Sequence, residues 1–168
     1  MLTFEDVKKD LENISLSESP RLVAHVGEKS ERIGSFFAEQ FNAGLICLPS
    51  LDLKSYSPKL KKITNTALRF LPESVLRRLS KSYKQWIRKI DLVLPEDFDL
   101  SVISGNDSVL LVDDSTFTGN TMEFWKKRIR DSSDGRVYTF SITVNGDYHP
   151  DYFCSEEWQS FAWRPLGI

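Results

Sequence analysis

The chain has 168 residues, of which 40% are apolar and 27% are charged, and its formal net charge is −2. A chain of this length is expected to form one domain (1–168) with a substantial core. No stretch is long and apolar enough for a transmembrane helix, and the first residues lack the basic start of a signal peptide, so we expect a cytoplasmic protein without a membrane partner. Cys47 and Cys154 have no metal-binding spacing, which argues against a zinc site or a disulfide framework and predicts two core thiols.

The charge is distributed unevenly along the chain. From Lys54 to Lys89 there are eleven lysines and arginines and a single acid, Glu73, so this part carries +10, whereas the remainder has eleven basic and 23 acidic residues and carries −12. Apolar residues beyond Pro72 recur at helical spacing and predict a basic helical insertion over residues 54–90. Its basic side chains fit two interpretations, a solvated helix face or a surface that attracts nucleic acid or an anionic membrane.

The amino-terminal part of the chain predicts alternating helices and strands. Thr3 is expected to cap a first helix that has apolar residues on one face. A strand over residues 21–26 and a helix over residues 31–42 follow, and Gly44 suits the C-terminal cap of that helix. A second strand is expected over residues 45–48.

A tight turn joins the first strand to the second helix. It consists of Gly27, Glu28, Lys29 and Ser30, and taken alone it is an ordinary strand-to-helix turn with a solvated lysine. His25, in the strand before it, alternates with apolar neighbours. We therefore expect His25 to be a hydrogen-bonded strand residue rather than a catalytic base.

The second half of the chain predicts three strands and a helix. A short strand is expected over residues 100–103, a buried central strand over residues 109–112, a helix over residues 122–129 and an alternating strand over residues 137–144. The closing segment (145–168) has several aromatic residues and no regular pattern. Its aromatic side chains could stack on a planar ligand or pack in the core or at an interface.

The end of the central strand has the features of a ligand site. The apolar run is followed at once by two carboxylates, Asp113 and Asp114, and then by a polar loop, Thr118-Gly119-Asn120-Thr121. Ligands of open α/β sheets bind at the carboxyl ends of strands, and a loop that opens a helix directs free backbone N–H groups at an anion. The loop is therefore a candidate phosphate site and the two acids are candidates for binding hydroxyls or a divalent metal, although a bare pair of acids would equally suit a turn.

This stretch resembles the 5-phosphoribosyl 1-diphosphate (PRPP) motif of the type I phosphoribosyltransferases. That motif is a hydrophobic strand, two acids, three mostly small or apolar positions and then Thr-Gly-x-Thr, and it matches here at Val109–Val112, Asp113, Asp114, Thr118, Gly119 and Thr121. The basic stretch and short connector before the strand also resemble, loosely, the ComF-like branch of the family. Phe117 departs from the pattern, because the family usually has Thr, Ser or Ala there, and its ring removes a phosphate-binding hydroxyl and adds bulk.

The resemblance implies a fold and a set of site residues. The fold would be α/β, a parallel sheet flanked by helices, with a small hood formed by the basic insertion (54–90) and the C-terminal segment (145–168). The hood offers a third interpretation of the basic charge, as part of a loop that closes over PRPP. The residues implied for the 5-phosphate and the ribose are Asp113, Asp114, Ser115, Thr116, Phe117, Thr118, Gly119, Asn120 and Thr121, and those implied for the pyrophosphate are Gly27, Glu28, Lys29 and Ser30.

The resemblance also implies a reaction. The enzyme would transfer ribose 5-phosphate from PRPP to a base of unknown identity and release pyrophosphate, with Mg2+ as cofactor at Asp113 and Asp114 and these two carboxylates stabilising positive charge on the ribose. A homodimer is a further implied partner, since dimers are common in the family. The alternative is a non-catalytic regulator that binds PRPP or a nucleotide and contacts nucleic acid through the basic segment.

Overall fold

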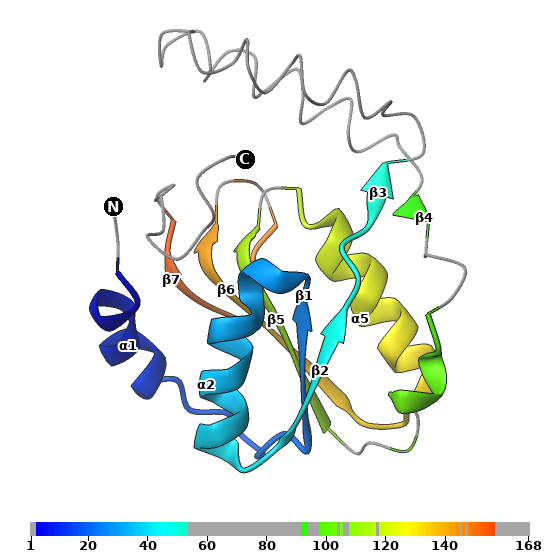
Figure 1. The fold of residues 1–168 in the computed structure, drawn as a ribbon, viewed down its shortest axis with the longest axis horizontal. Coiled ribbons are helices and arrows are strands. Elements are labelled where there is room, and N and C mark those ends of the chain that lie inside the picture. The colour runs from blue at the N-terminus through cyan, green and yellow to red at the C-terminus, as the bar shows by residue number, and fades with distance from the viewer. Residues whose placement is uncertain are drawn as a thin grey trace, which may run out of the picture.

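The computed structural model describes residues 3–53, 92–93, 98–103, 105, 108–116, 118–144, 146 and 148–156. A five-stranded, all-parallel sheet with the order β2-β1-β5-β6-β7 forms the centre (Figure 1). Its strands are Leu22–Val26 (β1), Gly44–Leu48 (β2), Ser108–Thr116 (β5), Arg136–Val144 (β6) and Tyr152–Ser155 (β7). The flanking helices are Phe4–Glu12 (α1), Glu31–Phe41 (α2) and Asn120–Ser132 (α5).

Three short elements complete the described part. Two are 3-10 turns, Glu28–Ser30 (η1) and Leu100–Val102 (η2). The third is an antiparallel ladder of Asp52–Leu53 (β3) with Leu92–Val93 (β4). The expected α/β fold with a parallel sheet is confirmed. The expected hood is not, because residues 54–90 lie outside the described residues and the closing segment contributes β7 to the sheet itself.

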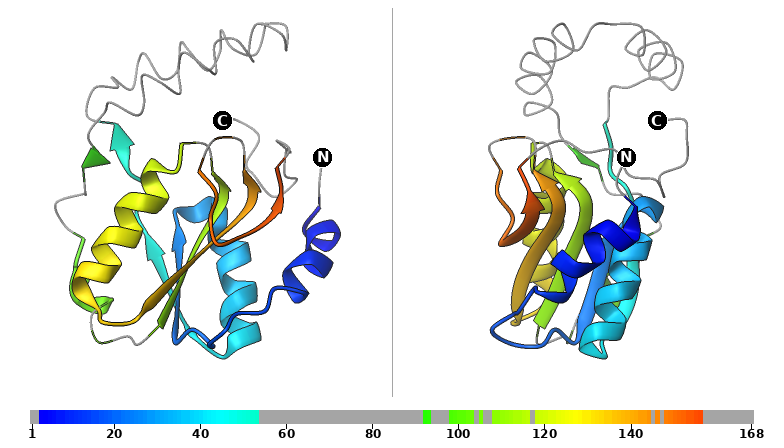
Figure 2. Two further views of the ribbon diagram at one scale, coloured as in Figure 1. Left: turned by 180° about the vertical axis from the view of Figure 1, so that it is seen from behind. Right: turned by 90° about the vertical axis from the view of Figure 1, so that its left-hand side faces the viewer.

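The sheet is covered on both faces, as Figure 2 shows. On one face α1 and α2 pack Leu11, Ile33 and Phe37 against strand residues such as Leu110 and Val112. On the other face α5 packs Met122, Trp125 and Ile129 against Val109 and Leu111. The side chains of successive β5 residues therefore pack into the cores on opposite faces of the sheet. This explains why the sequence of β5 is an unbroken apolar run rather than an alternating one.

The start of the chain folds as its sequence predicts. The side chain of Thr3 accepts a hydrogen bond from the Asp6 N–H, and the Asp6 carboxylate accepts one from the Thr3 N–H at 2.7 Å. This reciprocal pair satisfies backbone donors that the first turn of α1 leaves free. The polar cap fixes where the helix starts, and Val7 and Leu11 then face the core.

Three local predictions are wrong. The C-terminal cap of α2 is Asn42 (φ 51°), because asparagine tolerates the left-handed conformation, and Gly44 instead begins β2. Residues 100–102 form η2 rather than a strand, since the Asp99 carboxylate accepts hydrogen bonds from both the N–H and the hydroxyl of Ser101. Cys47 is exposed rather than a core thiol, because it lies on the edge strand β2, whereas Cys154 is half-buried in β7 and burial raises its pKa to about 12.

The central strand is longer than its apolar run. β5 continues through the two acids to Thr116, because β6 runs beside it and pairs Ser115 with Thr143 and Thr116 with Val144. Asp113 and Asp114 are therefore strand residues. Their backbone is therefore fixed by the pairing of β5 with β6 and does not form a loop.

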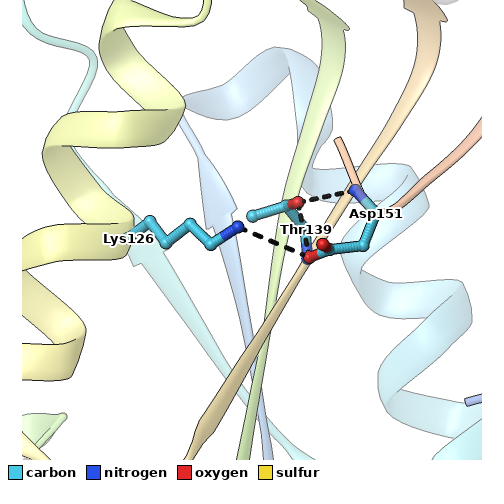
Figure 3. Close-up of polar contacts among 3 residues, drawn as sticks. All are labelled: Lys126, Thr139 and Asp151. Atoms are coloured by element: carbon cyan, nitrogen blue, oxygen red, sulfur yellow. Dashed lines mark hydrogen bonds and ion pairs between the residues drawn. The ribbon is translucent and has the colours of Figure 1, made fainter. Parts of the chain in front are cut away.

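The last strand, β7, was not expected from the sequence. A polar cluster fixes its start: the Asp151 carboxylate accepts hydrogen bonds from the N–H and the hydroxyl of Thr139, both at 2.8 Å (Figure 3). The Thr139 hydroxyl in turn accepts the Asp151 N–H at 2.9 Å, and the Lys126 ammonium of α5 lies 3.7 Å from the same carboxylate. These contacts attach β7 to β6 and to α5.

His25 is a buried strand residue, as expected. It is 4% exposed, and its Nδ1 donates to the Gly27 carbonyl at 2.9 Å. Its ring and Cβ pack against Gly34 of α2, where an added Cβ would lie 2.9 Å from the His25 Cβ. The absence of a side chain at Gly34 lets α2 approach β1 closely.

This close approach predicts the effect of Gly34→Ala. Alanine is favoured over glycine in a helix by about 1 kcal/mol, but overpacking a tight contact costs roughly 1–3 kcal/mol, so we expect a net loss of about 1 kcal/mol. Urea unfolding measures the difference, with Ser35→Ala on the same helix as the control for helix propensity alone. A gain in stability for Gly34→Ala would show that the packing can relax.

No helix within the described ranges has the length and apolar character that a membrane span requires.

Candidate functional site

The candidate site lies where two neighbouring strands lead in opposite directions. β1 continues through α2 to β2 on one side, and β5 continues through α5 to β6 on the other, with the two helices on opposite faces of the sheet (Figure 1). Such a switch point opens a crevice at the carboxyl ends of the strands, which is where ligands of open α/β sheets bind. The turn after β1 and the two acids of β5 both lie there.

Ser30 joins the turn to the acids. β1 pairs with β5 only as far as His25 with Val112, so the next residues of β5 have no strand on that side. The Ser30 hydroxyl accepts the Asp114 N–H at 3.0 Å and donates to the Asp113 carboxylate at 3.2 Å. Ser30 is fully buried, so its hydroxyl holds the Asp113 carboxylate and the Asp114 backbone from inside the protein. The sequence predicted the turn and the acids as one site, but not this bond between them.

Asp114 is buried and Asp113 half-buried, and their two charges repel each other. Asp114 is 5% exposed and accepts a hydrogen bond from the Ser115 hydroxyl at 3.3 Å. Burial, and secondly the charge of Asp114, raise the pKa of Asp113 well above its ordinary value, although bonds from the Asp114 N–H and Ser30 favour the charged form. A cation or several hydroxyl donors placed over the pair would relieve this strain. The site therefore favours a ligand rich in hydroxyl groups or a bound cation.

The phosphate loop, Thr118–Thr121, leads directly from β5 into α5. Gly119, the N-cap residue of α5, has the left-handed conformation (φ 75°) and no side chain that could cap the helix. The Asn120 N–H donates a hydrogen bond to the Thr118 hydroxyl at 3.4 Å. A glycine at the start of a helix with a hydroxyl beside it suits a phosphate. Phe117, the departure from the family motif, lies outside the described residues.

The turn after β1 also requires glycine. Gly27 has φ 63°, its N–H donates to the Leu48 carbonyl at 2.8 Å, and the Ser50 hydroxyl occupies the space that a Cβ would need. Glu28 is exposed and Lys29 half-buried on η1. The turn is therefore fixed against the end of β2, with Lys29 on the same 3-10 turn as Ser30.

The remaining predicted residues lie around these groups. Ser115 is half-buried, and Thr116 is 2% exposed with a hydroxyl that makes no hydrogen bond to the described part of the chain. Asn120 and Thr121 are half-buried in the first turn of α5. The structure thus brings the described candidates to one edge of the sheet, at different depths.

Sequence reasoning missed Tyr148. It precedes β7, and its side chain fills the space where a Cβ of Gly119 would lie. A tyrosine in a turn-rich segment has no periodic signal, so only the contact identifies it.

The carboxylates offer a limited metal site. Within the described ranges no group of three or more His, Cys, Asp or Glu side chains could hold a metal ion. Mg2+ takes six oxygen ligands and is commonly held by one or two carboxylates together with substrate phosphates and water. Asp113 and Asp114 fit that role for an ion that enters with a diphosphate ligand.

No protein-family model matches the chain, and no curated protein matches its sequence. Solved structures do match it. The purine phosphoribosyltransferase of Pyrococcus horikoshii has a TM-score of 0.63 at 15% identity, over 99% of this chain and 94% of that one. The xanthine-guanine-hypoxanthine phosphoribosyltransferase of Helicobacter pylori has a TM-score of 0.58 at 15% identity, over 96% and 88%.

A third similar structure is a hypothetical protein from Neisseria gonorrhoeae with bound ppGpp. Its TM-score is 0.61 at 12% identity, over 98% of this chain and 88% of that one. Likenesses at such low identity concern the arrangement of the chain rather than its chemistry. Because they extend over nearly the whole length of this chain and agree with the parallel sheet, the chain has the type I phosphoribosyltransferase fold.

Proposed function

We propose that the protein is a phosphoribosyltransferase that transfers ribose 5-phosphate from PRPP to a base and releases pyrophosphate. The observation that carries the proposal is the Ser30 hydroxyl, which joins the turn after β1 to the two acids of β5 at the switch point of the sheet. The phosphate loop opens α5 four residues further on. Three sites for three parts of one ligand then lie on one edge of the sheet.

Each part of PRPP has a counterpart in the chain. The amides of the phosphate loop would bind the 5-phosphate, with Thr118 and Thr121 as hydroxyl donors. Asp113 and Asp114 would accept the ribose hydroxyls, and the amides of the turn at Gly27 would face the pyrophosphate, with the Lys29 ammonium beside them. Mg2+, when bound, would neutralise charge on the departing pyrophosphate.

The acid pair also suits the transition state. Departure of pyrophosphate builds positive charge on the ribose ring, and two carboxylates held next to the ring, one buried and one half-buried, would stabilise that charge more strongly than water would. A nitrogen of the acceptor then attacks the ring carbon directly, so no protein nucleophile is required. The strain between Asp113 and Asp114 in the free protein is relieved as the charge develops.

Calorimetry with PRPP and Mg2+ tests the site. We expect the double variant Asp113→Asn/Asp114→Asn to bind PRPP on the order of 100-fold more weakly, because charge-assisted hydrogen bonds to the ribose are lost. Asp131→Asn/Asp134→Asn removes two exposed carboxylates elsewhere and is the control for net charge. Equal affinity of the acid-pair variant and the wild type would contradict the assignment.

Release of pyrophosphate in the presence of candidate bases tests the reaction. Purine bases are the first acceptors to examine, because two solved structures of the same fold are named as purine phosphoribosyltransferases. PRPP binding without release in the presence of any base would favour the second candidate function.

That second candidate is a nucleotide-responsive regulator without catalysis. It is favoured by the Neisseria gonorrhoeae protein of the same fold, which was solved with ppGpp. Competition between ppGpp and PRPP in calorimetry is its first test. A regulator that also contacts nucleic acid would bind a polynucleotide with an affinity that falls steeply with salt, whereas the transferase has no need of such binding.

A further inference from the structure

Tyr148 packs directly on the phosphate loop. A Cβ added at Gly119 would collide with the Cβ, Cγ and Cδ2 atoms of Tyr148. The contact is thus made by the Cβ and the ring of the tyrosine. They lie against the backbone of Gly119, which has the left-handed conformation. Glycine is the residue with the greatest backbone freedom, so Gly119 has no side chain of its own to fix its conformation.

Tyr148 lies in the connector between β6 and β7, whose last residue is bonded to the sheet. The connector, residues 145–151 between β6 and β7, is described at 146 and 148–151. Its last residue, Asp151, bonds to the backbone and hydroxyl of Thr139 and faces the ammonium of Lys126 (Figure 3). Tyr148 also packs against the core between α5 and the sheet. Asp151 is thus held against β6 and α5, and Tyr148, three residues before it, packs on both the core and the phosphate loop.

The hydroxyl of Tyr148 makes no hydrogen bond within the described part of the chain, although it is buried. Burial raises the pKa of this phenol, so it stays neutral. The part of Tyr148 that touches the loop is apolar. A phenylalanine would preserve that contact.

We propose that Tyr148 is a positioning residue that holds the phosphate loop in its anion-binding conformation. This inference rests on the proposed function, since the loop is taken to bind the 5-phosphate of PRPP. Backbone amides bind an anion well only when they converge on it without first having to reorganise. Gly119 has no side chain that could pack against its surroundings. The ring of Tyr148, from the connector after β6, packs against it instead.

The test compares Tyr148→Ala with Tyr148→Phe. We expect Tyr148→Ala to weaken PRPP binding in calorimetry by roughly 10- to 100-fold, because small misplacements of binding groups have effects of that size. Tyr148→Phe is expected to bind as the wild type does. Ile129→Ala removes a buried side chain further along α5 and is the control for a general loss of stability. An equal loss of affinity in Ile129→Ala and Tyr148→Ala would overturn the inference.

Hydrogen exchange gives a readout that does not need PRPP. In the unliganded protein, Tyr148→Ala should speed the exchange of the amides of residues 118–121 and leave those of β6 unchanged, and Ile129→Ala should not produce this local pattern. Unchanged exchange at residues 118–121 would also overturn the inference. If the wild type fails to bind PRPP, the proposed function fails, and the exchange result still decides whether Tyr148 orders the loop.

Discussion

Gly119→Ala should lower the free energy of unfolding by about 3 kcal/mol. Two costs combine: the left-handed backbone (φ 75°) strains any residue with a Cβ by roughly 1–2 kcal/mol, and the collision with Tyr148 adds an overpacking cost of roughly 1–3 kcal/mol. Urea unfolding measures the sum. PRPP binding should be lost as well, because the loop must move to accommodate the methyl group.

Gly105→Ala separates the two costs. Gly105 has a similar backbone conformation (φ 81°), but an added Cβ there would meet no atom of the described residues within 4 Å. We expect only the strain, roughly 1–2 kcal/mol. In the background of Tyr148→Ala the ring is gone but the Cβ of residue 148 stays within collision distance, so the cost of Gly119→Ala should fall only part of the way toward that of Gly105→Ala. A cost that is the same with and without Tyr148 would show that the ring does not restrict the loop.

Asp113→Asn should stabilise the unliganded protein while it weakens PRPP binding. The asparagine oxygen can still accept the Ser30 hydroxyl and the Asp114 N–H, so the geometry is kept and only the buried charge is lost. We expect a gain of about 1–2 kcal/mol, a typical size for relief of a site that is strained for function. A substitution that raises stability and removes binding identifies a residue that serves the ligand rather than the fold.

The gain in stability of Asp113→Asn over the wild type should depend on pH. Burial and the charge of Asp114 raise the pKa of Asp113 in the folded state above its unfolded value of 3.8, so the native protein binds more protons than the unfolded chain between the two values. Wild-type stability therefore falls as pH rises through this window, and the variant lacks that fall. Thermal unfolding measured at a series of pH values upward from the unfolded pKa of 3.8 tests it. A gain that does not increase with pH would contradict the raised pKa, and Asp131→Asn controls for the loss of one exposed charge.

Several elements could be predicted because local chemistry and hydrophobic pattern agree on them. Thr3 has a carboxylate three residues later and caps α1, and Gly27 supplies the positive φ that the turn after β1 requires. The run from Val109 to Val112 serves two cores and is apolar throughout. In these places a few neighbouring residues determine the structure.

Other features depend on residues far apart in the sequence. Two acids after an apolar run are typical of a turn, yet β5 passes through them because β6 lies alongside. Tyr152–Ser155 is a half-buried edge strand whose start depends on bonds from Asp151 to Thr139, twelve residues away. No local pattern contains that information.

In the candidate site, too, some features could be predicted from the sequence and others depend on distant residues. Its position at the end of β5 was predicted from residue types and their order, and its association with the turn after β1 from the resemblance to the phosphoribosyltransferases. The Ser30 bond to Asp113 spans 83 residues, and Tyr148 contacts Gly119 from the connector that follows the neighbouring strand β6. The sequence thus indicates which ligand groups the site suits, while the residues that position those groups are found only in the fold.

The small ladder of β3 and β4 brings together the two chain segments that flank the basic insertion. Leu53 and Leu92 face each other in an antiparallel pair, so the two ends of the chain that flank residues 54–91 lie side by side. A two-residue turn such as Asn-Gly could join them as a hairpin. The shortened protein would lack eleven basic residues but keep the sheet, the acid pair and the phosphate loop. Ligand binding and the charge of residues 54–91 could then be measured as two separate properties of one domain.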